Sequence, residues 1–294
     1  TLHGAPFGLT SVSSSTVAID VLPSKRRGEG IGYWGLSNNF AMAVGPSLSL
    51  WIFTHYDNYN ILFTVSLVTA LIGLLINTTV DCKYRPPVLD KKKMSLDRFI
   101  MLEGWSQGLC IALVAVAYGV LSTYIAIYSQ DVLNITAGTG TFFMLFAVGL
   151  IMSRFFGVRY LSKGFVVRNA TYGVICVAIG YSLFAFWQNL YGYYISAVVI
   201  GFGQGSMYPA VQTMFLNMAS NDKRGTANAT ILTSWDLGIG LGIIGGGYVA
   251  EHLGGYNSAF LLSVIVSVIS VVFFISYARK EYDKSLKSKV ETRQ

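Results

Sequence analysis

The chain has little charge, little proline and very few histidines or cysteines. Asp, Glu, Lys and Arg make up 12% of its 294 residues, about half the share that is usual in soluble globular domains. The three histidines and three cysteines follow no metal-ligand or disulfide spacing, so we expect no metal, no cofactor and structural thiols. No catalytic motif and no phosphate-binding loop occurs, which argues against an enzyme and against ATP-driven transport.

Lysine and arginine are also missing from every second connection between hydrophobic stretches. They cluster at 25–27, 83–98, 154–168, 223–224 and 279–293, whereas 55–60, 129–139, 188–191 and 251–257 contain none. Cytoplasmic loops of membrane proteins carry these residues in excess, so the asymmetry predicts a multi-pass protein of the plasma (inner) membrane with a cytoplasmic C-terminus. The net charge of +7 therefore reflects topology, and we expect no nucleic-acid partner.

Hydrophobic residues make up 53% of the chain, and they gather in runs that can each cross a bilayer. A span needs about 20 apolar residues in helical form, and open strand edges are not stable in lipid. The sequence therefore predicts an all-α membrane protein with nine spans, at 2–21, 31–53, 61–80, 99–128, 138–157, 170–187, 193–217, 227–250 and 258–278. The charged connection at 81–98, which holds Pro86-Pro87, is expected to be a cytosolic linker between two groups of helices.

The first three runs repeat in the last three. Shifted by 197 residues, Gly4 aligns with Gly201, Arg27-Gly28 with Arg224-Gly225, and Tyr59-Asn60 with Tyr256-Asn257. This register indicates a duplication in which the runs between 99 and 187 have no upstream counterpart. We therefore expect an N-terminally truncated chain lacking about 95 residues with three more spans, which would not transport by itself.

Three segments resemble the major facilitator superfamily. They are the stretch at 2–8, the loop at 25–32 with its Arg-Arg-Gly, and the helix ending in Gly45-Pro46. The similarity covers the whole chain, from the fourth to the twelfth helix, and is closest to the twelve-helix proton-linked drug and sugar (arabinose-type) efflux branch. The Gly-Pro pair belongs to that branch's antiporter signature, although the usual following glycines are replaced near Ser49-Leu50. A loop resembling the family's basic motif follows the fifth run, with Arg159 but without the usual acidic residue.

This resemblance implies a major facilitator-type helical bundle with nine of twelve transmembrane helices present. Residues 1–80 would be the last three helices of the N-terminal half, 81–98 the linker, 99–278 the six-helix C-terminal half and 279–294 a basic cytosolic tail. The implied function is proton-coupled efflux of a small organic solute or drug by alternating access, in a monomer whose partners are substrate, protons and lipid. Sugar or metabolite uptake is the alternative, and a non-transporting membrane sensor or enzyme a remote one.

Acidic residues within the spans are the candidates for proton coupling, because a charge at membrane depth is costly. Asp236 lies about three turns into its span, where desolvation favours the neutral acid; a structural hydrogen bond is the other interpretation. Glu103 is expected one to two turns inside the fourth span, on the same face as Gln107, or else at the interface near Arg98. Arg154 is expected to extend to the surface, with contact to an anionic substrate as the alternative.

Uncharged polar and aromatic residues supply the candidates for a substrate cavity, since sites of this architecture lie near the midplane. Asn39 aligns with Asp236 in the repeat. Gln204, Tyr208 and Gln212 follow one another every four residues, so they share one face of the seventh span. The alternative role is hydrogen bonding between helices. The candidates are Trp34, Asn38, Asn39, Gln107, Tyr118, Tyr124, Gln204, Tyr208 and Gln212.

Glycine and proline mark two further expectations. Gly45 and Pro46, and the matching Gly242 and Gly246, are expected to let their helices bend during alternating access. The repeated pairs Arg27-Gly28 and Arg224-Gly225 are expected in cytosolic loops.

Overall fold

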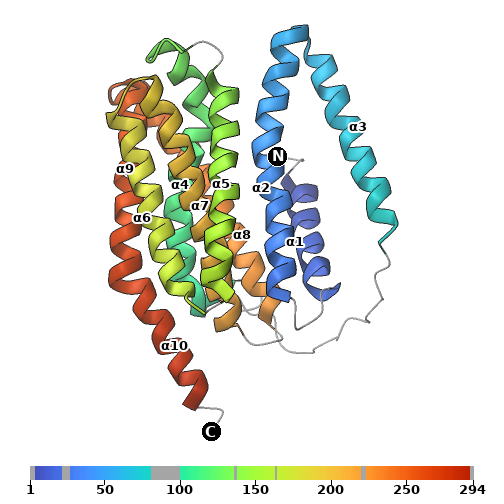
Figure 1. Ribbon diagram of the computed structural model, residues 1–294, viewed down its shortest axis with the longest axis vertical. Coiled ribbons are helices and arrows are strands. Elements are labelled where there is room, and N and C mark those ends of the chain that lie inside the picture. Colours follow the sequence, from blue (N-terminus) through green and yellow to red (C-terminus); the bar gives the residue numbers. More distant parts are fainter. Residues whose placement is uncertain are drawn as a thin grey trace. The chain divides into compact units, whose positions relative to one another are not determined.

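The computed structural model describes residues 4–21, 27–80, 100–135, 138–162, 164–219 and 223–291, and every regular element within them is a helix (Figure 1). The predicted all-α fold is confirmed. The chain divides into two compact units, Thr1–Met94 and Ser95–Gln294, each of which is described by itself. The expected linker at 81–98 lies outside the described residues, and the predicted domain limits stay a prediction.

The first unit contains three helices. They are α1 (Gly4–Val21), α2 (Arg27–Tyr56) and α3 (Tyr59–Thr78), with α2 packed against both neighbours. The chain reverses between α2 and α3 at Asp57, whose φ of 44° is a left-handed conformation that Asp tolerates. Asn58 then caps α3, its side chain accepting a hydrogen bond from the Asn60 backbone N–H at 2.8 Å. None of the residues of α3 is buried.

The second unit contains six long helices and an extension. A 3-10 turn (Leu102–Gly104) leads into α4 (Trp105–Asp131), followed by α5 (Gly138–Ser162), α6 (Val166–Phe186), α7 (Leu190–Met218), α8 (Arg224–His252) and α9 (Gly255–Phe273). A π-helical turn, Phe274–Ala278, continues α9 into α10 (Arg279–Glu291). Among the described residues, α3, α4, α5, α6, α8 and extended α9 are long and apolar enough to cross a membrane. The remaining expected spans, in α1, α2 and α7, are helical but less apolar.

Glycines set how closely the helices of this unit approach. A Cβ on Gly119 of α4 would collide with the Ile239 carbonyl of α8, and one on Gly242 of α8 would collide with the Val116 carbonyl of α4. Gly203 of α7 is equally tight against α6, because its Cβ would lie 2.6 Å from the Val177 nitrogen. Helix association in lipid depends on van der Waals packing, so small residues at such contacts are its main source of stability.

Helix boundaries follow the repeat seen in the sequence. Shifted by 197 residues, α2 (Arg27–Tyr56) falls on 224–253, and α8 is Arg224–His252. The same shift moves α3 onto 256–275, and α9 begins at Gly255. This agreement supports the interpretation that these segments are duplicated.

One expectation about connections is wrong. Arg27, Gly28, Arg224 and Gly225 are not loop residues, because they form the first turns of α2 and α8. Within the segment predicted as a basic tail, Arg279–Glu291 forms α10, which docks on the bundle where the Asn217 side-chain amide donates to the Tyr282 hydroxyl at 2.9 Å. Basic composition alone could not reveal these tertiary contacts.

The glycine contact between α4 and α8 is testable with a matched pair of substitutions. Gly242→Ala puts a methyl group against the Val116 backbone and should cost about 1–3 kcal/mol, a drop of several degrees in unfolding temperature. Gly240→Ala, in the same helix, meets nothing within 4 Å and should leave the unfolding temperature unchanged or raise it. Thermal unfolding of the detergent-purified full-length protein measures both, and equal effects would contradict the packing role.

Candidate functional site

Aromatic side chains from four different helices meet in the second unit. The Trp235 ring of α8 lies 5.6 Å from the Tyr118 ring of α4 and 5.5 Å from the Tyr208 ring of α7, centroid to centroid. Tyr118 in turn contacts Phe146 of α5, with ring centroids 6.0 Å apart. We call Tyr118, Phe146, Tyr208 and Trp235 the aromatic cluster, and the side of α7 and α8 on which half-buried Tyr208 and Trp235 lie the inner face. Tyr118 and Tyr208 were predicted as cavity residues, whereas Trp235 was not.

Asp236 follows Trp235 and is the acidic group nearest to this cluster in the chain. It lies about 18 Å along α8 from Arg224, well inside the helix. Its carboxylate interacts electrostatically with Tyr208, and the side chain is exposed on the second unit. In the described part of the chain no cation or hydrogen-bond donor is paired with it. An acid so placed can take up a proton or a cationic group of a ligand.

The polar stripe along α7 lies beside the aromatic cluster. Gln204, Tyr208 and Gln212 follow one another at four-residue spacing, so they share one face of the helix. Gln212 donates from Nε2 to Oδ1 of Asn228 in α8 at 3.3 Å, which closes the stripe toward the basic end of the bundle. Gln204 is only 5% exposed, and its Nε2 has no hydrogen-bond partner. Sequence spacing therefore located this face of α7 but not the environment of each amide.

Arg154 of α5 differs from the sequence expectation. Its side chain is half-buried, and its Nε is fully enclosed without a hydrogen-bond partner, so the group does not simply extend to the surface. The neighbouring Ser153 is fully buried against Gly205 of α7. Arg154 is thus a second charged group of the second unit within its helices, after Asp236.

Gln107 and Glu103 do not share a face. Gln107 is fully buried and donates from Nε2 to the Ala278 carbonyl at 3.0 Å, where the π-helical turn meets α10, while Ser106 donates to its Oε1 at 2.9 Å. Glu103 is exposed in the 3-10 turn before α4, which places it at the end of the span and not one to two turns inside. The contacts of Gln107 are structural, because they tie α4 to extended α9.

Tyr124 also has a structural partner. Its hydroxyl donates to the Ile243 carbonyl of α8 at 2.7 Å, and its ring lies 5.9 Å from that of Tyr256 in α9. A Cβ on Gly246 would lie 3.2 Å from this ring, so Gly246 makes room for it. Tyr124 thus helps join α4, α8 and α9, which position the inner face.

The candidates of the first unit are placed less fully. Trp34 lies on α2 with 37% of its side chain exposed. Asn38 and Asn39 lie on the same helix, but their side chains are outside the described part. Gly45 and Pro46 lie within α2, which is helical throughout, and Gly242 and Gly246 lie within the equally continuous α8. Bending at these positions stays a prediction.

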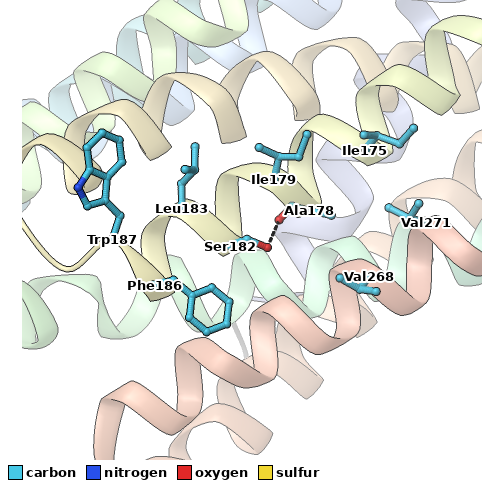
Figure 2. A pocket seen from close by; sticks show the side chains of 9 residues that line it. All are labelled: Ile175, Ala178, Ile179, Ser182, Leu183, Phe186, Trp187, Val268 and Val271. Carbon is cyan, nitrogen blue, oxygen red and sulfur yellow. Dashed lines mark hydrogen bonds between the residues drawn. The ribbon is translucent and has the colours of Figure 1, made fainter.

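An apolar groove runs between α6 and α9, away from the aromatic cluster. Figure 2 shows the side chains that line this groove, which has a volume of about 680 Å³. They come from α6 between Ile175 and Phe186, from Trp187 directly after α6, and from Val268 and Val271 of α9. The hydroxyl of Ser182 is already used, since it donates to the Ala178 carbonyl at 2.8 Å. The groove therefore offers mainly apolar contacts, which suit acyl chains.

A family model described as Major Facilitator Superfamily matches residues 1–190 and again 170–293. Among curated relatives, the Staphylopine export protein of Staphylococcus aureus (strain Mu50) is 23% identical over 93% of this chain and 72% of its own length. Inner membrane transport protein YdhP of Escherichia coli (strain K12) is 26% identical over 95% of this chain and 70% of its own length. The transporter YhhS of the same strain is 24% identical over 81% of this chain and 57% of its own length.

Solved structures show the same fold. The transporter FucP in its outward conformation superposes with a TM-score of 0.59 at 16% identity, over 92% of this chain and 71% of FucP. A bacterial homologue of the human lysosomal transporter Spinster, inward-facing and unoccupied, superposes with a TM-score of 0.61 at 15% identity. The match covers 92% of this chain and 74% of the homologue. At these identities the likeness concerns the fold alone.

The structural role of Gln107 predicts a separation between stability and binding. Gln107→Met keeps a similar volume but leaves the Ala278 carbonyl without its donor, so the full-length protein should lose about 1–3 kcal/mol of stability. Thermal unfolding measures the loss, and equilibrium binding of a transported solute should be unchanged in the folded fraction. Weaker solute binding with an unchanged unfolding temperature would instead support a role for Gln107 in substrate binding.

Proposed function

The chain belongs to the Major Facilitator Superfamily, a family of membrane transporters of small molecules, and from that premise we propose that it serves proton-coupled export of a small organic solute by alternating access. The solute site lies on the inner face of the second unit, where Tyr118, Tyr208 and Trp235 meet. In the first unit, Trp34, Asn38 and Asn39 stay candidates for cavity residues. The observation that carries the proposal is Asp236, an acid without a cationic partner in the described part, beside these aromatic rings.

The chemistry of this pair of features favours exchange. Aromatic faces attract organic cations, and an ionised carboxylate attracts them more strongly. The carboxylate of Asp236 can neutralise either a proton or an ammonium group, but it cannot hold both. Solute binding therefore releases the proton, and proton binding releases the solute, which is the requirement for antiport.

Orientation and direction are part of the same proposal. The alternation of basic and base-free connections supports a plasma-membrane protein whose C-terminus lies in the cytoplasm. Export is supported by the relative named as an export protein, which is similar over 93% of this chain. Solute would then load from the cytoplasm while a proton enters from outside.

Alternating access requires helices that change their packing without losing it. We place this freedom in α2 and α8, where Gly45-Pro46 and the glycines around Gly242 occupy matching positions of the repeat. Pro46 lacks the N–H that an uninterrupted helix would use, which weakens α2 at that point. Gly242 in turn lets α8 lie directly on the α4 backbone, a contact that can shift without a side chain to displace.

Proton coupling is tested in inverted membrane vesicles that hold the full-length protein and a proton gradient. Organic cations and sugars are added one at a time, and the compound that the protein transports should dissipate the proton gradient. Asp236→Asn should abolish this response. Glu103→Gln, which removes an exposed carboxylate at the end of α4, should keep it. A response that survives Asp236→Asn would remove the coupling role from Asp236, and loss only in Glu103→Gln would transfer it. No response to any compound would favour uptake or facilitated diffusion.

Equilibrium binding adds a pH test. Protonation neutralises Asp236, so the affinity of the wild-type protein for a solute with an ammonium group should fall as pH decreases from 8 to 5. Asp236→Asn should bind more weakly and with little pH dependence, because it has no charge to lose. Isothermal titration across this range measures both, and an affinity that rises toward low pH in the wild type would contradict antiport.

A further inference from the structure

Two buried N–H donors in the second unit have no acceptor. Nε of Arg154 in α5 and Nε2 of Gln204 in α7 are both fully enclosed and without a hydrogen-bond partner in the described part of the chain. Gln204 is 95% buried, being 5% exposed. A buried donor without an acceptor carries its full desolvation cost, and this cost is larger for a guanidinium. Neither group therefore contributes to stability through a hydrogen bond at these atoms.

Both side chains point to the same side of the helix pair. Helices α5 and α7 are separated by the single span α6, so they run in the same direction (Figure 1). They touch where Gly205 of α7 faces Ser153 of α5. Arg154 follows Ser153 and Gln204 precedes Gly205, so each is rotated by about 100° from the contact, in opposite senses seen along the common direction. For parallel helices that face each other, these rotations bring both side chains to one side.

That side is the inner face. Tyr208, one turn after Gln204 on the same face of α7, contacts Trp235 of α8, and Phe146, two turns before Arg154, contacts Tyr118 of α4. Arg154 lies about 12 Å, and Gln204 about 21 Å, from the ends of their helices at Ser162 and Met218. Asp236, about 18 Å from Arg224 on α8, is at comparable depth. The two donors and this carboxylate therefore border the same region around the aromatic cluster.

We propose that Arg154 and Gln204 form an anion subsite that binds a carboxylate of the transported solute, which makes that solute an amphoteric amino-carboxylate. A carboxylate supplies the acceptor oxygens that both donors lack, and hydrogen bonds to an ionised acceptor are the strong kind. The ammonium group of the same solute pairs with Asp236. The identity of the solute's cationic end rests on the proposed function, whereas the anion subsite depends only on Arg154 and Gln204.

Stability of the ligand-free protein gives the first test, because it requires no knowledge of the natural solute. If Arg154 serves to bind an anionic ligand, Arg154→Met removes a half-buried charge whose Nε has no acceptor and should raise the unfolding temperature of the full-length protein by a few degrees. Gln204→Met should raise it as well. Arg168→Met is the control, since Arg168 is exposed and donates to the Tyr172 hydroxyl at 3.0 Å; it should give no increase. A clear decrease for Arg154→Met would overturn the proposal.

Binding of matched probes gives the second test. L-tryptophan and L-tryptophanamide share the ring and the amine and differ in the carboxylate. In a thermal-shift titration the wild type should prefer tryptophan by at least about tenfold, and Arg154→Met should lose this preference while Arg168→Met keeps it. Equal affinity for the two probes in the wild type, or a preference that survives Arg154→Met, would overturn the subsite. If neither probe binds, the sign of the stability change in Arg154→Met decides.

Asp236→Asn separates the two proposals in the same titration. It should weaken the binding of both probes, because both carry the amine, and should leave the ratio of their two affinities unchanged. If the ratio is intact in Asp236→Asn but proton movement in vesicles also survives in this variant, Asp236 loses the coupling role and the anion subsite stands. If Asp236→Asn abolishes proton movement but the wild type shows no preference for the carboxylate, the coupling role stands and the anion subsite is overturned.

Discussion

Close approach between helix backbones is the constraint on which the second unit depends. In lipid the apolar surface of a helix gains little by contacting another helix, so the helices are held by dense packing and a few hydrogen bonds. At Gly119, Gly149, Gly201 and Gly242 the neighbouring helix presents a backbone carbonyl where a side chain would begin. The positions of α4 against α8 and of α5 against α7 follow from these contacts.

This packing leaves the polar side chains of the unit in two classes. Gln107 and Tyr124 hydrogen-bond to carbonyls of other helices and so belong to the framework. Arg154 and Gln204 are enclosed without an acceptor, and Asp236 lies beside the aromatic cluster without a cation in the described part. The enclosed donors of Arg154 and Gln204 carry a desolvation cost in the empty protein, and a ligand that supplies acceptor oxygens recovers this cost.

The repeat connects the two units without fixing their arrangement. Helices α2 and α8 begin at equivalent positions, Arg27 and Arg224, and carry glycine at the equivalent positions 45 and 242. Gly242 is used against α4, whereas nothing lies within 4 Å of a Cβ placed on Gly45. Equivalent residues thus have different surroundings in the two units, so the role of one cannot simply be transferred to the other.

The sequence by itself determined the helical class, the nine runs, the repeat and the face of α7 that carries Tyr208, because these depend on hydropathy and on spacing along one helix. It did not determine which polar residues are bound to neighbours. Gln107 and Gln204 are both amides within hydrophobic runs, yet only Gln107 has a carbonyl partner, at Ala278. The pairing of Trp235 with Tyr118 and Tyr208, and the enclosure of Arg154, were likewise decided by tertiary structure, since they depend on how close and in which rotation separate helices meet.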